Sequence, residues 1–307
     1  MIKSIINDRN SIDFTFDKGL DFYDPESHKQ TTYSRFSTGY DYFDKVLGGG
    51  YSLKTLISLA GMPKVGKSLI LGNLACQGVK MGYNVAYISL EMADAKIVKR
   101  LGSNMLNIKI TEYDRISQDN YEMKQRLSKF KNNAEDFQLP GELRVKEFPT
   151  STAGVPDIEN WLKKTQELDG KKFKLVVVDY IGIMKNWRNP NSENTYMKIK
   201  QVAEDLRAMA MRNDWCVLTA SQFNRGAYSN SDVTLEHIAE SSALIHTVDC
   251  LMGIIQDEMM YMNSEYYIKT LANREEGWKN SKKRFTVSYD FMRISEDMDS
   301  AIIESTF

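Results

Sequence analysis

The chain has few cysteines and no long apolar run. Its three cysteines, Cys76, Cys216 and Cys250, are too few and too irregularly spaced for a disulfide framework or a zinc cluster. Cys216 and Cys250 lie inside apolar runs, so we predict that they are small core side chains in a reducing compartment. No apolar run reaches the roughly 18 residues of a membrane span, and the N-terminal MIKSIINDRN lacks the apolar region of a signal peptide. These absences predict a soluble, intracellular protein without membrane contact.

The chain also lacks an excess of charge of either sign. Its 40 basic and 41 acidic residues give a net charge of −1, which argues against a protein whose whole surface coats nucleic acid. A near-neutral chain can still hold phosphates through a few loops that line a channel. With 307 residues, 42% of them hydrophobic, the chain is long enough to bury a sizeable core.

Internal repeats, low-complexity tracts and clear linkers after about residue 40 are missing as well. Residues 1–35 carry few aliphatic side chains and predict a linker or docking segment. Residues 36–307 predict one large domain.

From about residue 36, short apolar runs alternate with stretches of helical periodicity. The runs at 55–60, 84–90, 174–180 and 216–221 are largely apolar, which is typical of strands buried on both faces. After about residue 248 the pattern changes to consecutive strands. This order predicts an α/β fold with a mostly parallel sheet, helices on both faces and an antiparallel C-terminal strand extension.

The segment GMPKVGKS, residues 61–68, matches a phosphate-binding loop, with two glycines, a lysine and a hydroxyl at fixed spacing. It lies between a predicted strand and a predicted helix, as such a loop requires. Glycines let backbone N–H groups face phosphate oxygens, Lys67 would reach the β and γ phosphates, and the Ser68 hydroxyl would bind Mg²⁺. We therefore predict a site for ATP or GTP that is formed by Gly61, Pro63, Lys64, Val65, Gly66, Lys67, Ser68 and Leu69.

Three further polar side chains follow the ends of predicted strands. Asp179 ends the run LVVVD, and its carboxylate would hold the Mg²⁺ together with Ser68. Glu91 follows the run at 84–90, where a carboxylate could activate the water that attacks the γ phosphate. Gln222 follows the run at 216–221, where an amide could sense that phosphate. Carboxyl ends of parallel strands meet at one edge of a sheet, so these side chains are expected near the glycine loop.

Six segments in fixed order resemble the C-terminal motor domain of DnaB-family replicative helicases. They are STGYDYFDKVLGGG (37–50), GMPKVGKS (61–68), SLEM (89–92), VVVDYIGIM (176–184), ASQFNR (220–225) and AESSALIHTVDCLMGIIQ (239–256). The resemblance covers about residues 36–295. It is strongest to the replicative helicases of T-even bacteriophages, for which it extends to NSDVTLEHIAES (230–241) and IKTLANR (268–274).

This resemblance implies a RecA-like P-loop NTPase fold, a homohexameric ring and 5′ to 3′ movement on single-stranded DNA, driven by ATP or GTP with Mg²⁺. It assigns Glu91 as the catalytic base, Lys67 to the phosphates and Gln222 to sensing. It makes Arg274 an arginine finger that enters a neighbouring subunit's site. A primase and a helicase loader are implied as partners, in the cytoplasm of a phage-infected bacterium.

The resemblance also implies that DNA is contacted by loops that face the channel of the ring. Six subunits would repeat each weak contact around the channel, and backbone N–H groups can hold phosphates as well. The DNA-binding residues expected from it are Lys185, Arg188, Arg225, Glu240 and Ser242.

The chain departs from the family pattern at three places. A lysine usually stands two residues before the finger arginine, where this chain has Ala272, and an arginine usually precedes Glu240, where it has Ala239. Family members also carry a helical domain before the motor domain. Residues 1–35 resemble only the linker after that domain, so we expect a truncated chain, a fragment or a naturally short relative.

Two other classes of function remain open from the residues. A RecA-like ATPase could act as a recombination mediator or an oligomeric switch, because the segment at 37–50 occurs in such proteins too. A binding module could use nucleotide only to assemble, for which Ala272 is the relevant departure. The segments ASQFNR and AESSALIHTVD favour the helicase.

Overall fold

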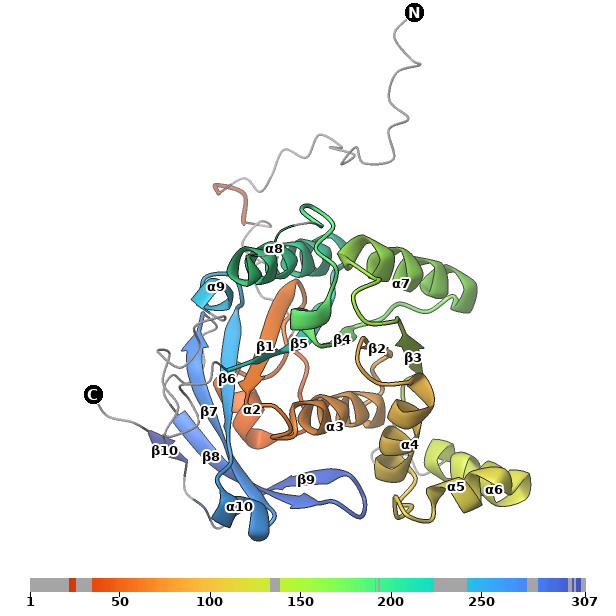
Figure 1. Ribbon diagram of the computed structural model, residues 1–307. Helices are drawn as coiled ribbons and strands as arrows, with labels where there is room; N and C mark the ends of the chain where they lie inside the picture. Colours follow the sequence, from red (N-terminus) through yellow and green to blue (C-terminus); the bar gives the residue numbers. More distant parts are fainter. Residues whose placement is uncertain are drawn as a thin grey trace, which may run out of the picture. The chain divides into compact units, whose positions relative to one another are not determined.

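The computed structural model describes residues 22–25, 35–132, 139–190, 192, 194–223, 242–274, 281–297, 300 and 302–304. Residues Arg35–Phe307 form one compact unit and Met1–Ser34 form another. The helices and strands labelled in Figure 1 lie in the Arg35–Phe307 unit.

The centre of this unit is a ten-stranded sheet in the order β10-β8-β7-β6-β1-β5-β4-β2-β3, with β9 paired to β8. The strands are β1 (Thr55–Gly61), β2 (Val85–Ser89), β3 (Leu143–Glu147), β4 (Leu175–Asp179), β5 (Cys216–Gln222), β6 (Cys250–Ile255), β7 (Glu265–Asn273), β8 (Ser281–Ser288), β9 (Arg293–Glu296) and β10 (Ile303–Glu304). The helices are α2 (Asp41–Val46), α3 (Lys67–Lys80), α4 (Asp94–Met105), α5 (Tyr113–Gln118), α6 (Asn120–Asn132), α7 (Val155–Asp169), α8 (Thr195–Asn213), α9 (Ser242–Ile245), α10 (Glu258–Met262) and the 3-10 helix η2 (Ile181–Ile183).

The predicted mostly parallel sheet with an antiparallel extension is confirmed. Strands β3, β2, β4, β5, β1 and β6 pair in parallel, and β7, β8, β9 and β10 pair antiparallel. The extension begins at β7 rather than at about residue 248, because β6 still pairs in parallel with β1. The segment ELRVKEF at 142–148 alternates apolar and charged side chains, which predicts an edge strand, and β3 does lie at the edge of the sheet.

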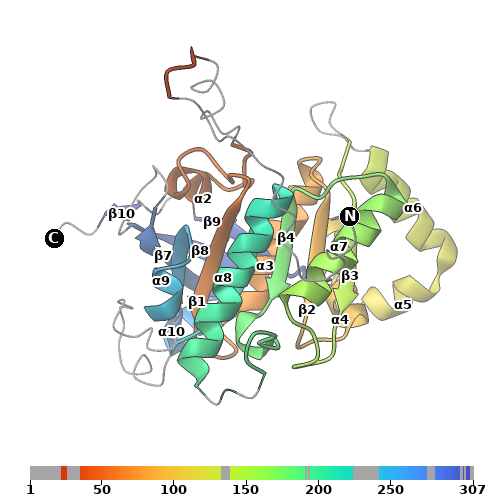
Figure 2. The same ribbon diagram turned by 90° about the horizontal axis from the view of Figure 1, so that it is seen from above.

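Helices cover both faces of the parallel strands. Alternate strand residues point to opposite faces, so Leu59, Val177 and Leu218 pack on the side of α3, whereas Val178 and Val217 pack on the side of α7 and α8. Figure 1 shows these two helix layers on either side of the sheet, and Figure 2 shows α8 crossing over β1. Each such aliphatic side chain stabilises the fold by about 1.5–3 kcal/mol when fully buried.

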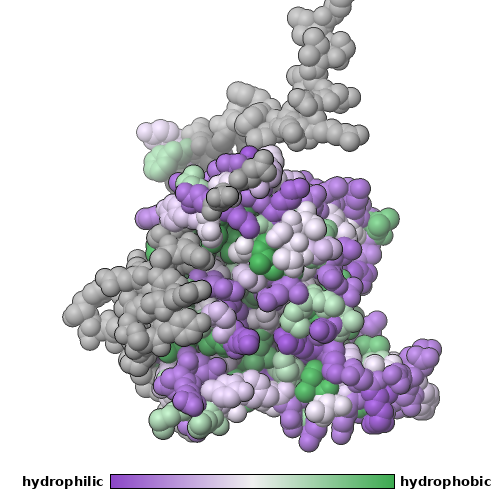
Figure 3. Space-filling model, viewed as in Figure 1, coloured by the Kyte–Doolittle hydropathy of each residue, from purple (hydrophilic) through white to green (hydrophobic). Residues whose placement is uncertain are grey.

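The region between β2 and β3 ends in a polar helical segment. The lysine-rich stretch 119–133 predicts one surface helix, and the structure has the short α5 followed by α6, which has no buried residue. The corresponding end of the molecule is mainly hydrophilic in Figure 3, at lower right.

The three cysteines are buried and reduced, as the sequence predicts for Cys216 and Cys250. None of the helices in the described ranges combines the length and the apolar composition that crossing a bilayer requires.

Candidate nucleotide-binding site

The carboxyl ends of four neighbouring parallel strands lie side by side along one border of the sheet, at the ends of the strands rather than at an outermost strand. Gly61 at the end of β1 pairs with Gln222 at the end of β5. Asp179 at the end of β4 pairs with Ser89 at the end of β2, and Glu91 follows two residues later. The structure thus brings the predicted glycine loop and the three predicted polar side chains to the same border, where ligands bind in sheets of this class.

The glycine loop has a backbone that its two glycines permit. Gly66 lies in the left-handed region, with φ 101° and ψ 18°, and directly precedes α3. At Gly61 a Cβ atom would lie 2.7 Å from Cγ1 of Val65, so any other residue there would force Val65 to shift. Pro63 and Lys64 are exposed at the tip of the loop. Val65 and Leu69 are buried and anchor the loop to the core. The loop therefore presents the N-terminus of a 14-residue helix, a favourable place for a phosphate.

Lys67 is buried in this loop. Its Nζ donates hydrogen bonds to the carbonyl oxygens of Gly61, at 3.0 Å, and Met62, at 2.7 Å. Burial lowers the pKa of Lys67 to about 8, although the charges of Asp179 and Glu91 act to raise it. The ammonium group is therefore held by neutral carbonyls close to two carboxylates, a position in which an added anion would stabilise its charge.

Asp179 is buried at the end of β4 and is held by two hydroxyl groups. Tyr87 donates a hydrogen bond of 2.9 Å to its Oδ2, and the Ser68 side chain also hydrogen-bonds to it. Burial raises the pKa of Asp179, the hydrogen bonds from Ser68 and Tyr87 lower it, and the Glu91 charge raises it. The predicted pair of metal-binding residues, Ser68 and Asp179, is thus already in contact.

The donor set fits a metal that is bound together with a phosphate. Among the residues that the structure describes, no group of three or more histidine, cysteine or acidic side chains could hold a metal by itself. Ser68 and Asp179 supply two hard oxygen donors, which is typical of Mg²⁺ sites that complete their shell with phosphate oxygens and water.

Glu91 and Gln222 flank Asp179 at the same border. Glu91 is exposed at the start of the loop between β2 and α4, and its charge acts on both Lys67 and Asp179. The side-chain amide of Gln222 donates a hydrogen bond of 3.0 Å to the hydroxyl of Tyr180, the residue after Asp179. Their predicted roles as base and sensor remain predictions.

Arg274 lies at the opposite end of the strands, on the side where the parallel strands begin. It follows β7, whose last residue Asn273 pairs with Cys250, the first residue of β6. Cys250 in turn pairs with Ile57, four residues before the end of β1, which corresponds to about 13 Å along the strand. The exposed Arg274 side chain donates to the carbonyl oxygen of His246. The structure therefore separates Arg274 from the glycine loop of its own chain.

The residues predicted to contact DNA lie in different surroundings. Lys185 is exposed after η2. The guanidinium group of Arg188 lies against two carboxylates of α8, those of Asp205 and Glu204. Ser242 is the first residue of α9. Arg225 and Glu240 lie outside the described residues, and DNA binding by all five remains a prediction.

Sequence reasoning missed the two tyrosines that contact the site. Tyr87 lies inside the apolar run at 84–90 and Tyr180 follows Asp179. Most buried hydroxyl groups in proteins have a hydrogen-bond partner, so a tyrosine in an otherwise apolar strand points to a polar neighbour. That tendency was the available signal for Tyr87, but only the pairing of β2 with β4 identifies its partner as Asp179.

Comparison with known proteins identifies relatives over most of the chain. The family described as DnaB-like helicase C-terminal domain matches residues 36–288. The DnaB-like replicative helicase of Enterobacteria phage T4 is 33% identical over 243 residues, which are 79% of this chain and 50% of that protein. The chain thus spans about half the length of this relative.

Two solved structures share the fold. One is an ATPase domain that superposes with a TM-score of 0.71 at 17% identity, over 88% of this chain and 95% of its own. The other is a DnaB-like replicative helicase whose structure was described with its interactions with primase. It superposes with a TM-score of 0.69 at 18% identity, over 85% of this chain and 61% of its own. The fold is therefore the predicted RecA-like ATPase fold.

Proposed function

The chain belongs to the family of DnaB-like helicase C-terminal domains, and we propose that it is the NTP-hydrolysing motor of a hexameric replicative DNA helicase. The motor moves 5′ to 3′ on single-stranded DNA and uses ATP or GTP with Mg²⁺. One observation carries this proposal. Four strand ends bring the glycine loop, Asp179 and Gln222 together at one end of the sheet, whereas Arg274 lies at the other end, and this separation supports a site that two copies of the chain complete.

The chemistry of the site follows from its side chains. Lys67 exchanges the carbonyl oxygens of Gly61 and Met62 for the β and γ phosphates, and the phosphates stabilise its charged form. Ser68 and Asp179 hold Mg²⁺, which when bound neutralises phosphate charge. Glu91 is exposed beside them, where it accepts a proton from the attacking water.

Gln222 couples this site to the rest of the chain. In the structure its amide donates to the hydroxyl of Tyr180. A γ phosphate offers a stronger, charged acceptor to the same amide. Exchange of the two acceptors would release the Tyr180 hydroxyl and so pass the state of the γ phosphate to the residues that follow β4.

Arg274 acts on the site of a neighbouring copy. An arginine that enters the site stabilises the charge on the transferring phosphoryl group and is worth about 10³–10⁵ in rate. Its position at the end of the strands opposite the glycine loop supports action between copies, since a side chain cannot cross the sheet. Repetition of this contact around a closed ring gives the hexamer.

Partners follow from the same family membership. Single-stranded DNA is bound in the channel by Lys185, Arg188, Arg225, Glu240 and Ser242. A primase and a helicase loader bind the motor from outside, and the primase is supported by the structural relative that was described with one.

The test is hydrolysis of ATP and of GTP, with and without single-stranded DNA, at several protein concentrations. Because each site needs a second copy, the rate per chain should rise steeply with concentration and increase again with DNA. A slow rate that is independent of both would contradict the motor and favour a RecA-like mediator or oligomeric switch. The direction is tested with two duplexes that each carry one single-stranded tail. The duplex with a 5′ tail should be unwound, and the duplex with a 3′ tail should not.

A further inference from the structure

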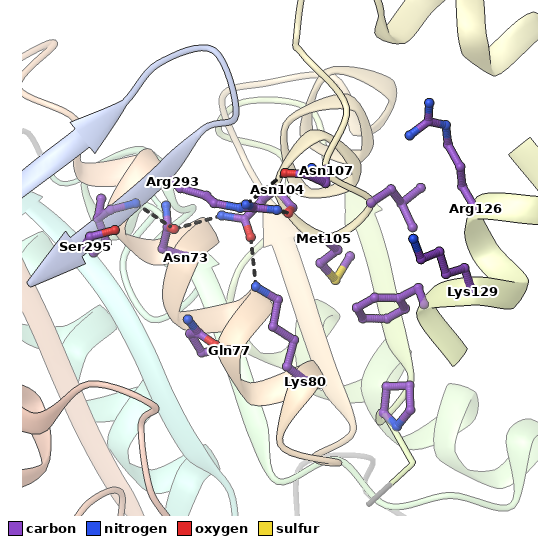
Figure 4. Close-up of a pocket in the computed structure, with 14 residues that line it drawn as sticks. Asn73, Gln77, Lys80, Asn104, Met105, Asn107, Arg126, Lys129, Arg293 and Ser295 are labelled. Atoms are coloured by element: carbon purple, nitrogen blue, oxygen red, sulfur yellow. Dashed lines mark hydrogen bonds between the residues drawn. The ribbon is translucent and has the colours of Figure 1, made fainter. Parts of the chain in front are cut away.

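A second pocket, of about 640 Å³, lies away from the glycine loop. It is lined by α3, the end of α4, α6 and β9, as Figure 4 shows. Its volume is within the range of small-molecule sites, about 300–1,000 Å³. None of the glycine-loop residues lines it, so it is separate from the site proposed above.

Four cations line this pocket, and its described lining includes no carboxylate. Lys80 comes from α3, Arg293 from β9, and Arg126 and Lys129 from α6. Arg126 is compensated by Glu122 on its own helix, with Nη2 and Oε1 2.8 Å apart. Lys129 is exposed and forms no ion pair with any residue that the structure describes.

Arg293 directs its donors at neutral acceptors. Its Nε donates to the carbonyl oxygen of Asn104 and its Nη1 donates to Oδ1 of Asn107, both at 3.0 Å. Burial raises the pKa of the nearby Cys76 thiol to about 12, and the charges of Lys80 and Arg293 both act to lower it. Two positive charges therefore act on the same part of α3, and carbonyl and amide oxygens only orient the guanidinium group without cancelling its charge.

The floor of the pocket is held rigidly by two buried asparagines. Asn104 Nδ2 donates to Asn73 Oδ1 at 2.8 Å, and the same oxygen accepts from the backbone N–H of Ile294 at 3.1 Å. Both Asn73 and Asn104 also donate to the carbonyl oxygen of Met292, at 3.0 Å. This network ties β9 to α3 and α4, and Lys80 Nζ donates to Asn104 Oδ1 at 3.4 Å, so Arg293 and Lys80 are positioned before any ligand arrives.

We propose that this pocket binds phosphate groups, of a free polyphosphate or nucleotide or of a DNA backbone. Lysine and arginine side chains from three elements can surround a polyanion from several directions at once. Met105 and Phe130 also line the pocket and would offer a base an apolar surface. Since the floor of the pocket is built on α3, which begins at Lys67, a bound anion would also act on the helix that carries the glycine loop.

The test is protection of lysine amines from acetylation, read by mass spectrometry on the nucleotide-free protein. Tripolyphosphate should slow the labelling of Lys80 and Lys129 at least about threefold more than sodium chloride of equal ionic strength, which screens surface charge without binding. Lys124 and Lys172, which lie outside the pocket, should respond to ionic strength alone. A single-stranded oligonucleotide, used in place of tripolyphosphate, tells whether DNA is the source of the phosphates.

Two variants make the result decisive. The double substitution Lys80→Gln with Lys129→Gln should weaken tripolyphosphate binding at this pocket by at least about tenfold in calorimetry, whereas Lys124→Gln with Lys172→Gln should not. Protection must persist in Lys67→Ala, because its loss there would mean that the effect is transmitted from the glycine loop. Labelling of Lys80 and Lys129 that follows ionic strength alone, with either anion, would overturn the proposal.

Discussion

The hydroxyl group of Tyr87 donates a hydrogen bond of 2.9 Å to Oδ2 of Asp179, and both side chains are buried between neighbouring strands. Asp179 pairs with Ser89, two residues after Tyr87, so the two side chains lie on the same face of the sheet. The Ser68 side chain hydrogen-bonds to the same carboxylate. Tyr87 therefore orients the carboxylate that is proposed to hold Mg²⁺.

Tyr87→Phe removes only this hydroxyl group. We expect the free energy of unfolding to fall by about 1–3 kcal/mol, because a buried carboxylate loses one of its donors. The Mg²⁺ concentration needed for half-maximal hydrolysis should rise, which a purely structural role of Tyr87 would not produce. Both are measured by urea unfolding and by Mg²⁺ titration of the hydrolysis rate.

The matched control for this prediction is Tyr266→Phe. The Tyr266 hydroxyl is also buried but has no hydrogen-bond partner among the described residues. Its removal should not lower the free energy of unfolding, because no hydrogen bond is lost with it, and should leave the Mg²⁺ dependence unchanged. An identical Mg²⁺ dependence in Tyr87→Phe and Tyr266→Phe would exclude the orienting role.

Lys67 should make stability depend on pH. Its pKa in the folded chain, about 8, is below the ordinary 10.5, so between these values the native state binds fewer protons than the unfolded state. The contribution of Lys67 to the free energy of unfolding therefore rises with pH across this window and is unfavourable below it. Lys67→Met should raise that free energy at pH 7 by about 1–3 kcal/mol, after the loss of two hydrogen bonds, while it abolishes hydrolysis.

Urea unfolding at pH 7 and pH 10 measures this difference. The stabilisation by Lys67→Met should shrink at the higher pH, where the wild-type amine is neutral in the folded chain. Lys64→Met, at the exposed tip of the same loop, is the control and should have little effect at either pH. A gain in Lys67→Met that is equal at both pH values would mean that better packing, rather than charge, is its cause.

Glu91→Gln keeps the size of the side chain and removes the proposed base. Hydrolysis should fall by at least about 10²-fold, whereas nucleotide affinity should change little, because Lys67 and Ser68 are intact. Stopped-flow binding and steady-state hydrolysis measure the two separately. Asp94→Asn, another exposed acidic residue three positions along, should hydrolyse normally, and continued turnover in Glu91→Gln would assign the base elsewhere.

Arg274→Ala and Glu91→Gln should restore activity to each other when mixed. Each variant alone is expected to lose at least about 10²–10³ in rate. In an equal mixture about a quarter of the interfaces join an intact Glu91 site to an intact Arg274, because a head-to-tail interface has one order of subunits. Hydrolysis measured across mixing ratios should therefore peak near equal amounts, and a flat, inactive series would contradict action between copies.

Local sequence determined the class of fold and the phosphate loop. Buried parallel strands are continuous apolar runs, and helices repeat at 3.6 residues, so the order of β1 to β5 with α3, α7 and α8 follows from periodicity. GMPKVGKS is recognisable because glycine, lysine and serine act there through neighbouring backbone atoms. The short α5 and α10 were missed, since helices of 6 and 5 residues have too few turns to produce a periodic pattern.

Only the tertiary structure decided which side chains meet. The order of strands in the sheet places Glu91, Asp179 and Gln222 beside the loop, and it places Arg274 at the far end of the strands, which no local pattern contains. Likewise the contact of Tyr87 with Asp179 depends on strand register, and the cationic pocket joins Lys80 to Arg293 across more than two hundred residues of sequence. Local periodicity records whether a residue is buried, whereas its partner depends on long-range pairing that only the folded sheet provides.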